Sequence, residues 1–171
     1  MSKIKTVFVA GPTASGKTEL AIKLAKRFDG EIVSADSMQI YKGIHIASAA
    51  PDTAEMQGIP HYMLEFLEPG DSFSVAEYVK AARAYIKDIA SRGRLPIVAG
   101  GTGLYINSLA DNISYIEEET DENLRRELEK RFESVGAEQM LNELKEIDPD
   151  TAERLNLNDK KRIIRAFEVY R

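Results

Sequence analysis

Residues 11–18 read Gly-Pro-Thr-Ala-Ser-Gly-Lys-Thr, which matches the pattern G-x-x-x-x-G-K-[ST] between an apolar run and a helical pattern. Glycines in such a loop let consecutive backbone N–H groups turn inward, where they meet phosphate oxygens at the positive end of the following helix. The lysine adds a mobile charge, and the threonine hydroxyl can ligate Mg²⁺. The pattern predicts a diphosphate-binding set composed of Gly11, Thr13, Ala14, Ser15, Gly16, Lys17 and Thr18. It does not name the reaction, because the loop can hold a nucleotide's phosphates or any other diphosphate.

Two more polar segments follow apolar runs. The first reads Ser-Ala-Asp-Ser-Met-Gln-Ile-Tyr at residues 34–41, and the second reads Gly-Gly-Thr-Gly-Leu-Tyr at residues 100–105. Because the carboxyl ends of strands line the ligand crevice of an open α/β sheet, we expect Asp36 and Thr102 near the phosphates. The alternative is local: Asp36 or Ser37 caps a turn, and Thr102 caps a helix after glycines that allow tight packing. His61 is more often a structural histidine than a base.

The elements that must position these residues alternate between short apolar strands and amphipathic helices, which predicts a P-loop α/β fold with a parallel sheet flanked by helices. A helix is expected over Lys17–Phe28. A capping box at Ser74 and Glu77 predicts the start of another helix, which should end near Gly93. The expected strands are Thr6–Ala10, Glu31–Ala35, His61–Phe66 and Leu95–Gly100.

The remainder, residues 117–171, is expected to be all-helical and to form a small inserted module. Apolar stripes surround Gly136, which should stop the first helix. Asp148 and Pro149 predict a short helix by their cap and first-turn preferences, and Asn158 is a plausible cap for a last one. The helical pattern stops at Arg171 after only about four strands, so we expect an incomplete fold unit whose open sheet edge needs further sequence or another chain to cover it.

Composition narrows the function classes. With 171 residues and 43% hydrophobic content the chain can bury a core. It has no cysteine and only two histidines, which argues against disulfides, thiolate chemistry and a zinc centre, so Mg²⁺ on oxygen ligands is the expected metal. No stretch approaches the roughly 18 apolar residues of a membrane span, and no signal-peptide pattern opens the chain, which favours a cytoplasmic protein.

The net charge of −5 gives no support for general nucleic-acid attraction, so RNA binding would require a local basic patch. Basic residues do gather in the helical part, at Arg125 and within two turns of the last helix. Their default interpretation is a solvated face that pairs with the abundant glutamates. The alternative is a local grip on a phosphate backbone.

Taken in order and spacing, the segments 11–18, 34–41, 100–105 and 158–169 resemble the tRNA dimethylallyltransferases, the tRNA isopentenyltransferase family. The resemblance covers nearly the whole chain, and it implies transfer of a dimethylallyl group from dimethylallyl diphosphate to N6 of an adenosine beside the tRNA anticodon. It makes residues 1–116 an incomplete catalytic core and residues 117–171 a tRNA-binding module. The implied partners are the tRNA anticodon stem-loop and dimethylallyl diphosphate; we predict no membrane and no stable protein partner.

The resemblance also implies roles for the residues. Asp36 would remove the proton from the weakly nucleophilic amine, and Thr102 would sit at the reacting centre. The loop, Lys17 and Mg²⁺ near Thr18 would stabilise the departing diphosphate. Because a stacked base cannot reach such a site, the adenosine would be extruded from its loop. The adenine and tRNA set implied by the resemblance is Ser37, Met38, Gln39, Arg125, Lys161, Arg162 and Arg165.

Some segments depart from the family pattern. Residues 47–51 read Ala-Ser-Ala-Ala-Pro where a Gly-Thr-Ala-Lys-Pro run is usual, and Asn156-Leu157 replaces the usual His-Pro. Family members also continue well beyond Arg171, with a catalytic-site arginine and further RNA contacts. We therefore expect this chain alone to be weakly active or inactive.

Two other functions remain open from sequence. The first is a small-molecule kinase that uses ATP, although a clear Mg²⁺-binding strand-end aspartate and an arginine-rich lid are missing. The second is an inactive RNA- or partner-binding fragment of the transferase. A related branch that prenylates free adenine nucleotides is less favoured, because the basic helical part favours tRNA.

Overall fold

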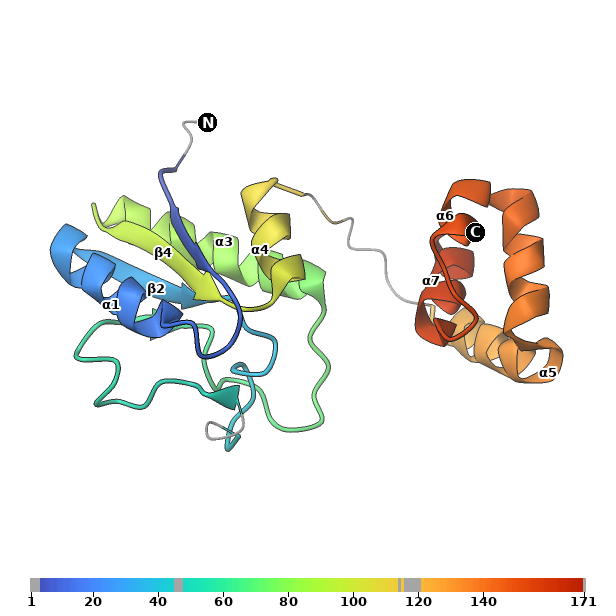
Figure 1. The fold of residues 1–171 in the computed structure, drawn as a ribbon, viewed down its shortest axis with the longest axis horizontal. Helices are drawn as coiled ribbons and strands as arrows, with labels where there is room; N and C mark the ends of the chain where they lie inside the picture. The colour runs from blue at the N-terminus through green and yellow to red at the C-terminus, as the bar shows by residue number, and fades with distance from the viewer. Residues whose placement is uncertain (1–3, 45–47, 114, 116–120, 171) are drawn as a thin grey trace. The chain divides into compact units, whose positions relative to one another are not determined.

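The computed structural model describes residues 4–44, 48–113, 115 and 121–170, and its contacts divide the chain into residues 1–116 and 117–171 (Figure 1). The first unit is a three-layer α/β structure. Its four strands are all parallel and lie in the order β1-β4-β2-β3. Their bounds are β1 Val7–Ala10, β2 Gly30–Ser34, β3 His61–Tyr62 and β4 Leu95–Gly100.

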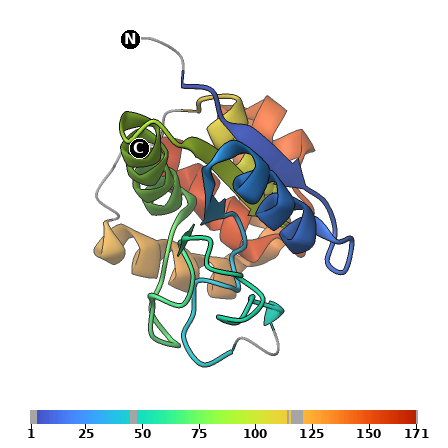
Figure 2. The same ribbon diagram turned by 90° about the vertical axis from the view of Figure 1, so that its left-hand side faces the viewer.

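Helices cover both faces of this sheet (Figure 2). On one face, α1 (Lys17–Phe28) packs its buried Ala21, Ile22 and Ala25 against the strands. On the other face lie α3 (Val75–Ser91) and α4 (Gly103–Ala110). Neighbouring strand residues alternate between the two cores, as expected from the two-residue repeat of a strand: Ile32 and Ile97 face α1, whereas Val33 and Val98 face α3 and α4.

The start of α3 is fixed by the predicted capping box. The Ser74 hydroxyl accepts from the Glu77 backbone N–H at 3.2 Å, and the Glu77 carboxylate accepts from the Ser74 backbone N–H at 2.7 Å. The hydrogen bonds that the Glu77 carboxylate accepts from the Ser74 backbone N–H and from the Ser74 hydroxyl lower the pKa of Glu77. The box satisfies two backbone donors that the helix itself cannot, so the sequence prediction is confirmed.

Replacing this cap tests its contribution. We expect Ser74→Ala to lower the free energy of unfolding by about 1 kcal/mol, because a donor in the first turn of α3 loses its acceptor. Urea unfolding followed by tyrosine near-ultraviolet circular dichroism measures this. Ser72→Ala, an exposed serine just before the cap, is the matched control and should leave the midpoint unchanged.

One predicted strand is much shorter than expected. The prediction of His61–Phe66 is wrong beyond Tyr62, because Met63 (φ 63°) and Glu65 (φ 43°) adopt left-handed backbone conformations that a strand cannot contain. The other three strands lie within one residue of their predicted bounds. β3 consequently forms only a two-residue pairing with β2, at Ile32 with His61 and Val33 with Tyr62.

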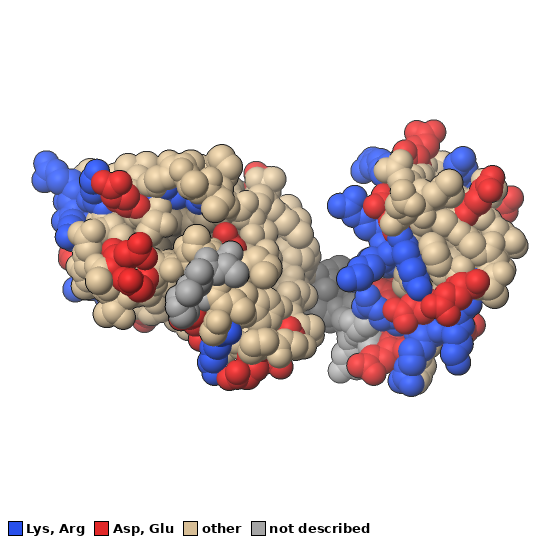
Figure 3. Space-filling view, turned by 60° about the horizontal axis from the view of Figure 1, so that its bottom comes forward, with Lys and Arg blue, Asp and Glu red and all other residues tan. Residues whose placement is uncertain are grey.

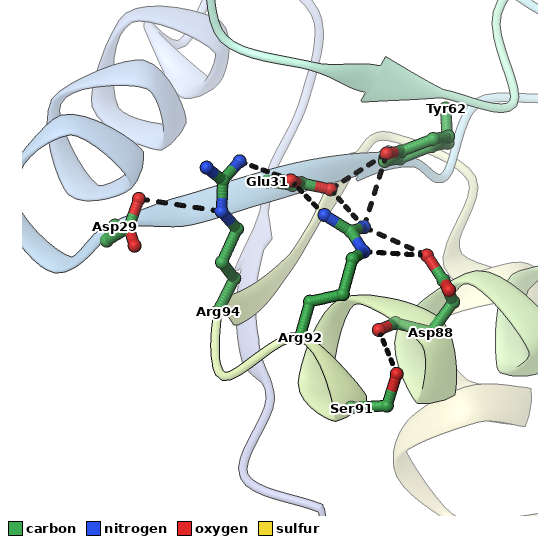
Figure 4. Close-up of polar contacts among 7 residues, drawn as sticks. All are labelled: Asp29, Glu31, Tyr62, Asp88, Ser91, Arg92 and Arg94. Atoms are coloured by element: carbon green, nitrogen blue, oxygen red, sulfur yellow. Dashed lines mark hydrogen bonds and ion pairs between the residues drawn. The ribbon is translucent and has the colours of Figure 1, made fainter.

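A buried carboxylate ties the amino-terminal ends of β2 and β4 to the end of α3 (Figure 4). Glu31 is 1% exposed and accepts two 2.6 Å hydrogen bonds from Arg92. Arg94 donates a third at 2.6 Å, and the Tyr62 hydroxyl a fourth at 2.8 Å. The Arg92 hydrogen bonds are the main cause that lowers the pKa of Glu31 to about 2. Asp88 in turn accepts from Arg92 at 2.9 Å.

The second unit is helical, as predicted, with α5 (Glu122–Ile147), α6 (Pro149–Glu153) and α7 (Lys160–Tyr170). α5 is interrupted at Gly136 (φ 82°, ψ 167°), which confirms the predicted break. The Asp148 side chain caps α6 by accepting from the Thr151 backbone N–H at 3.0 Å, again as predicted. The core is formed by Leu128, Met140, Leu141, Leu144, Ala152, Ile163, Ile164 and Phe167.

The predicted cap of the last helix is wrong in position. α7 begins at Lys160, so Asn158 lies one residue too early to cap it. Asp159 precedes the helix directly, and its side chain accepts from the Asn156 backbone N–H at 3.0 Å, which closes the turn before α7. No helix within the described residues is long and apolar enough to cross a membrane.

Candidate active site at the carboxyl ends of the strands

A cavity of about 420 Å³ lies where the glycine-rich loop meets the carboxyl ends of β2 and β4. It is shared by the phosphate loop, the segment after β2, the end of β4 and residues 48–57. Eight predicted site residues line it: Thr13, Ala14, Ser15, Gly16, Lys17, Thr18, Asp36 and Gln39. Its other lining residues are Glu19, Ile22, Ser48, Ala49, Pro51, Glu55, Gln57, Ala99 and Gly100.

The phosphate loop has the backbone geometry of an anion cradle. Ala14 (φ 62°) and Gly16 (φ 79°) are left-handed, and the N-cap residue of α1 is Gly16, which has no side chain to cap the helix, so the first N–H groups of α1 are left for a ligand. A Cβ added at Gly11 would lie 3.1 Å from the Ser15 hydroxyl, which would have to shift by a few tenths of an ångström. Lys17 Nζ donates to the Pro12 carbonyl at 2.5 Å, which keeps the ammonium within the loop.

Asp36 both forms a turn and faces the cavity. Its Oδ1 accepts from the Met38 backbone N–H at 2.9 Å, which is the local role that sequence left open. The side chain nevertheless lines the cavity, and Oδ2 lies near Gly101, 3.6 Å from where a Cβ would stand. The neighbouring Gly100 is obligatory, since its Cβ would meet the Ala35 carbonyl oxygen at 2.1 Å. One carboxylate oxygen is therefore used for the turn, while the other accepts no hydrogen bond from the described residues and lies near Gly101.

Thr102 links the ends of β2 and β4. It is the N-cap residue of α4, but its side chain makes no capping hydrogen bond there, so the alternative interpretation of Thr102 as a side-chain cap is wrong. Its Oγ1 accepts from the Ser37 backbone N–H at 2.9 Å and donates to the Ser37 hydroxyl at 3.2 Å. The Thr102 backbone N–H donates to the Ala35 carbonyl at 3.0 Å. Thr102 therefore bonds to both neighbours of Asp36, Ala35 and Ser37. These contacts hold the loop that contains Thr102 beside the Asp36 turn.

His61 does not line the main cavity. Its Nδ1 lies 2.8 Å from the Ile59 carbonyl oxygen, and burial lowers its pKa. It borders a separate cavity of about 20 Å³ together with Ser34 and Gln39. This placement supports the structural interpretation of His61.

The predicted RNA-binding residues lie in the helical unit. Arg125 Nε is 3.8 Å and Arg165 Nη1 3.1 Å from the carboxylate of Glu168, which is 6% exposed in its side chain. Lys161 and Arg162 are exposed on α7. Figure 3 shows lysine and arginine side chains gathered over one side of this unit, interspersed with acidic ones. The sequence left two interpretations of these basic residues open, pairing with glutamate and a local basic cluster. The structure contains both features.

Mg²⁺ would have few protein ligands here. The described residues contain no group of three or more histidine, aspartate or glutamate side chains suited to a metal ion. The Thr18 hydroxyl lines the cavity beside the loop. Because Mg²⁺ commonly binds through one or two protein oxygens plus substrate phosphates and water, this donor set fits the ion only together with a diphosphate.

Together, the parallel sheet and the glycine-rich loop at its carboxyl edge define a P-loop α/β protein. The chain belongs to the IPP transferase family, whose model matches residues 39–171. The resemblance to the tRNA isopentenyltransferase family that the sequence motifs indicated is therefore confirmed.

Named relatives agree. The chain is 52% identical over 167 residues to the tRNA dimethylallyltransferase of Caldanaerobacter subterraneus subsp. tengcongensis, covering 98% of this chain and 53% of that protein. It is 54% identical over 162 residues to that of Acetivibrio thermocellus, covering 95% and 52%. The chain thus spans about half the length of these curated relatives.

Solved structures show the same fold. The full-length tRNA isopentenylpyrophosphate transferase from Bacillus halodurans superposes with a TM-score of 0.66 at 42% identity, covering 98% of this chain and 55% of that one. A eukaryotic dimethylallyltransferase acting on tRNA gives a TM-score of 0.80 at 32% identity, covering 98% and 42%.

Proposed function

We propose that this chain provides the phosphate-loop and base-bearing part of an enzyme that transfers a dimethylallyl group from dimethylallyl diphosphate to N6 of an adenosine next to the tRNA anticodon. The observation that carries the proposal is the shared cavity, which is lined by the phosphate loop and by Asp36. Relatives named tRNA dimethylallyltransferase support it. A tRNA substrate also implies a cytoplasmic protein.

In this proposal the phosphate loop binds the leaving group. The backbone N–H groups of residues 13–18 and the Lys17 ammonium meet the charge that grows on the diphosphate as the C–O bond breaks. Mg²⁺, held by Thr18 and the phosphates, would supply further charge neutralisation. Lys17 must exchange the Pro12 carbonyl for a phosphate oxygen, which its flexible side chain permits.

In the same proposal, Asp36 activates the N6 amine of the adenosine. Its lone pair is delocalised into the purine, so removal of its proton by Asp36 as the new C–N bond forms lowers the barrier. Thr102 and Ser37 hold the Asp36 turn in place. The extruded base is oriented by Ser37 and Met38 in the segment after β2, and the RNA backbone is gripped by Arg125, Lys161, Arg162 and Arg165.

Lys17 gives the direct test of ligand class. We expect Lys17→Met to weaken Mg²⁺-pyrophosphate and dimethylallyl diphosphate binding about 10- to 100-fold, as expected for loss of a charge-assisted contact. Isothermal titration calorimetry measures the dissociation constants of both ligands. Lys23→Met, an exposed lysine two turns into α1, is the control and should bind like the parent chain.

The same titrations separate a transferase from a kinase. A transferase should bind dimethylallyl diphosphate in preference to ATP, and a tritiated prenyl group should appear on an anticodon stem-loop. Preference for ATP, with no label on the RNA, would contradict the proposal. Family membership and the named relatives give no support to the kinase.

A further inference from the structure

The side-chain amide of Gln39 spans the gap between the end of β2 and residues 48–49. Its Oε1 accepts from the Ser34 hydroxyl at 2.9 Å. Its Nε2 donates to the backbone carbonyls of Ala49 at 3.1 Å and Ser48 at 3.4 Å. Because carbonyl oxygens can only accept, the amide nitrogen must face them, and the orientation of the amide follows from chemistry.

The segment that Gln39 holds forms one wall of the active-site cavity. Ser48, Ala49 and Pro51 line the same cavity as the phosphate loop, and Ala50 between them is buried. With the diphosphate seated on the loop, the five-carbon tail of the proposed substrate would occupy the rest of the cavity, which Asp36 and this wall line. The wall therefore faces the prenyl part of the substrate and not its phosphates.

The wall also needs support from outside its own backbone. Ala49 has φ 50°, a left-handed conformation that costs an L-residue about 1 kcal/mol or more and persists only when its surroundings impose it. The Gln39 amide bonds directly to the carbonyl of this residue. Side-chain hydrogen bonding thus offsets local backbone strain at the cavity surface.

We propose that Gln39 is a positioning residue that holds residues 48–51 as the wall against the prenyl tail, and that it does not read the purine. Its Nε2 already donates to the carbonyls of Ser48 and Ala49, so turning the amide toward a base would break these contacts with the wall. The inference rests on the proposed function for the identity of the tail, while the support of the wall is a property of the chain itself.

Two measurements on Gln39→Leu test the two parts. Hydrogen exchange followed by mass spectrometry should show the amides of residues 48–50 exchanging at least fivefold faster, because the strained turn loses its partner. Calorimetry should show dimethylallyl diphosphate binding weakened about 5- to 10-fold, as for loss of one or two neutral hydrogen bonds, with inorganic pyrophosphate affinity within twofold. Gln139→Leu, an exposed glutamine on α5, is the matched control.

A conservative variant and a rescue sharpen the test. Gln39→Glu keeps an acceptor for Ser34 but turns a carboxylate oxygen toward two carbonyls, so it should be at least as defective as leucine. Adding Ala49→Gly to Gln39→Leu should restore at least twofold of the lost prenyl-diphosphate affinity, because glycine accepts φ 50° without strain. A direct role in reading adenine predicts no rescue by a change in the wall.

The outcomes separate the two proposals. Unchanged exchange at residues 48–50, an equal loss of pyrophosphate and prenyl-diphosphate binding, or absence of rescue would overturn the role of Gln39. A parent chain that binds pyrophosphate without any preference for its dimethylallyl ester would instead overturn the proposed function, whatever the exchange data show for the wall.

Discussion

Glu31→Gln is expected to lower the free energy of unfolding of the α/β unit by about 2–3 kcal/mol at pH 7. Ionised Glu31 is buried and accepts hydrogen bonds from Arg92, Arg94 and Tyr62, and its pKa of about 2 against an ordinary 4.5 corresponds to roughly 3 kcal/mol. We place the expectation at the lower side because the arginine side chains are 39% and 40% exposed and partly screened. Tyrosine near-ultraviolet circular dichroism during urea unfolding reports this unit, since Tyr170 is the one tyrosine outside it.

The stabilisation that ionised Glu31 provides should decrease as the pH falls. A carboxylate whose folded pKa is depressed adds stability that is present above pH 4.5 and is lost as pH falls toward 2. The difference between the parent chain and Glu31→Gln should therefore shrink to less than half by pH 3. Glu68→Gln, at an exposed ion pair with Lys42, should change stability little at either pH. A gap that stays constant from pH 7 to 3 would refute this account.

Asp36→Asn should slow prenyl transfer about 10²- to 10⁴-fold while leaving dimethylallyl diphosphate affinity nearly unchanged. Asparagine keeps an oxygen that can accept from the Met38 backbone N–H, so the turn survives, but it cannot take the proton from the adenosine amine. Single-turnover transfer of a tritiated prenyl group to an anticodon stem-loop, with protein in excess, measures the rate.

The control for this experiment is Asp111→Asn, an exposed carboxylate just after α4. It should retain the parent rate, which separates loss of the base from a change in net charge. If the parent chain labels the RNA above a protein-free blank, an equal rate for Asp36→Asn would exclude Asp36 as the base and leave it only its turn-forming role.

Local signals explain which parts of the fold were predictable. Ser74 with Glu77, Gly136, and Asp148 with Pro149 each act within a few residues, and each helix boundary they predict is present in the structure. The failed part of the His61–Phe66 strand is of a different kind. Its residues have acceptable strand propensities, but left-handed backbone at Met63 and Glu65 turns the chain away after two residues.

The candidate site was predictable where a motif marks it and hidden where it depends on distant partners. The cavity brings Asp36 to the phosphate loop, as expected from strands that end at one edge. The hydrogen bonds of Gln39 to residues 48–49 and of Thr102 to Ser37 were not foreseen, because they form only once the fold exists. The charged Glu31 at the start of an expected buried strand was a visible signal of a buried ion pair, although its arginine partners lie 61 and 63 positions along the chain.

The break in α5 has a stereochemical consequence. The backbone at Gly136 lies in a region that is nearly closed to L-residues, yet a side chain there would meet no atom within 4 Å. Handedness, and not crowding, excludes a side chain. A D-alanine introduced by chemical ligation would match the backbone that L-alanine opposes, so we expect mirror-image chemistry to stiffen the elbow between the two arms of this helix.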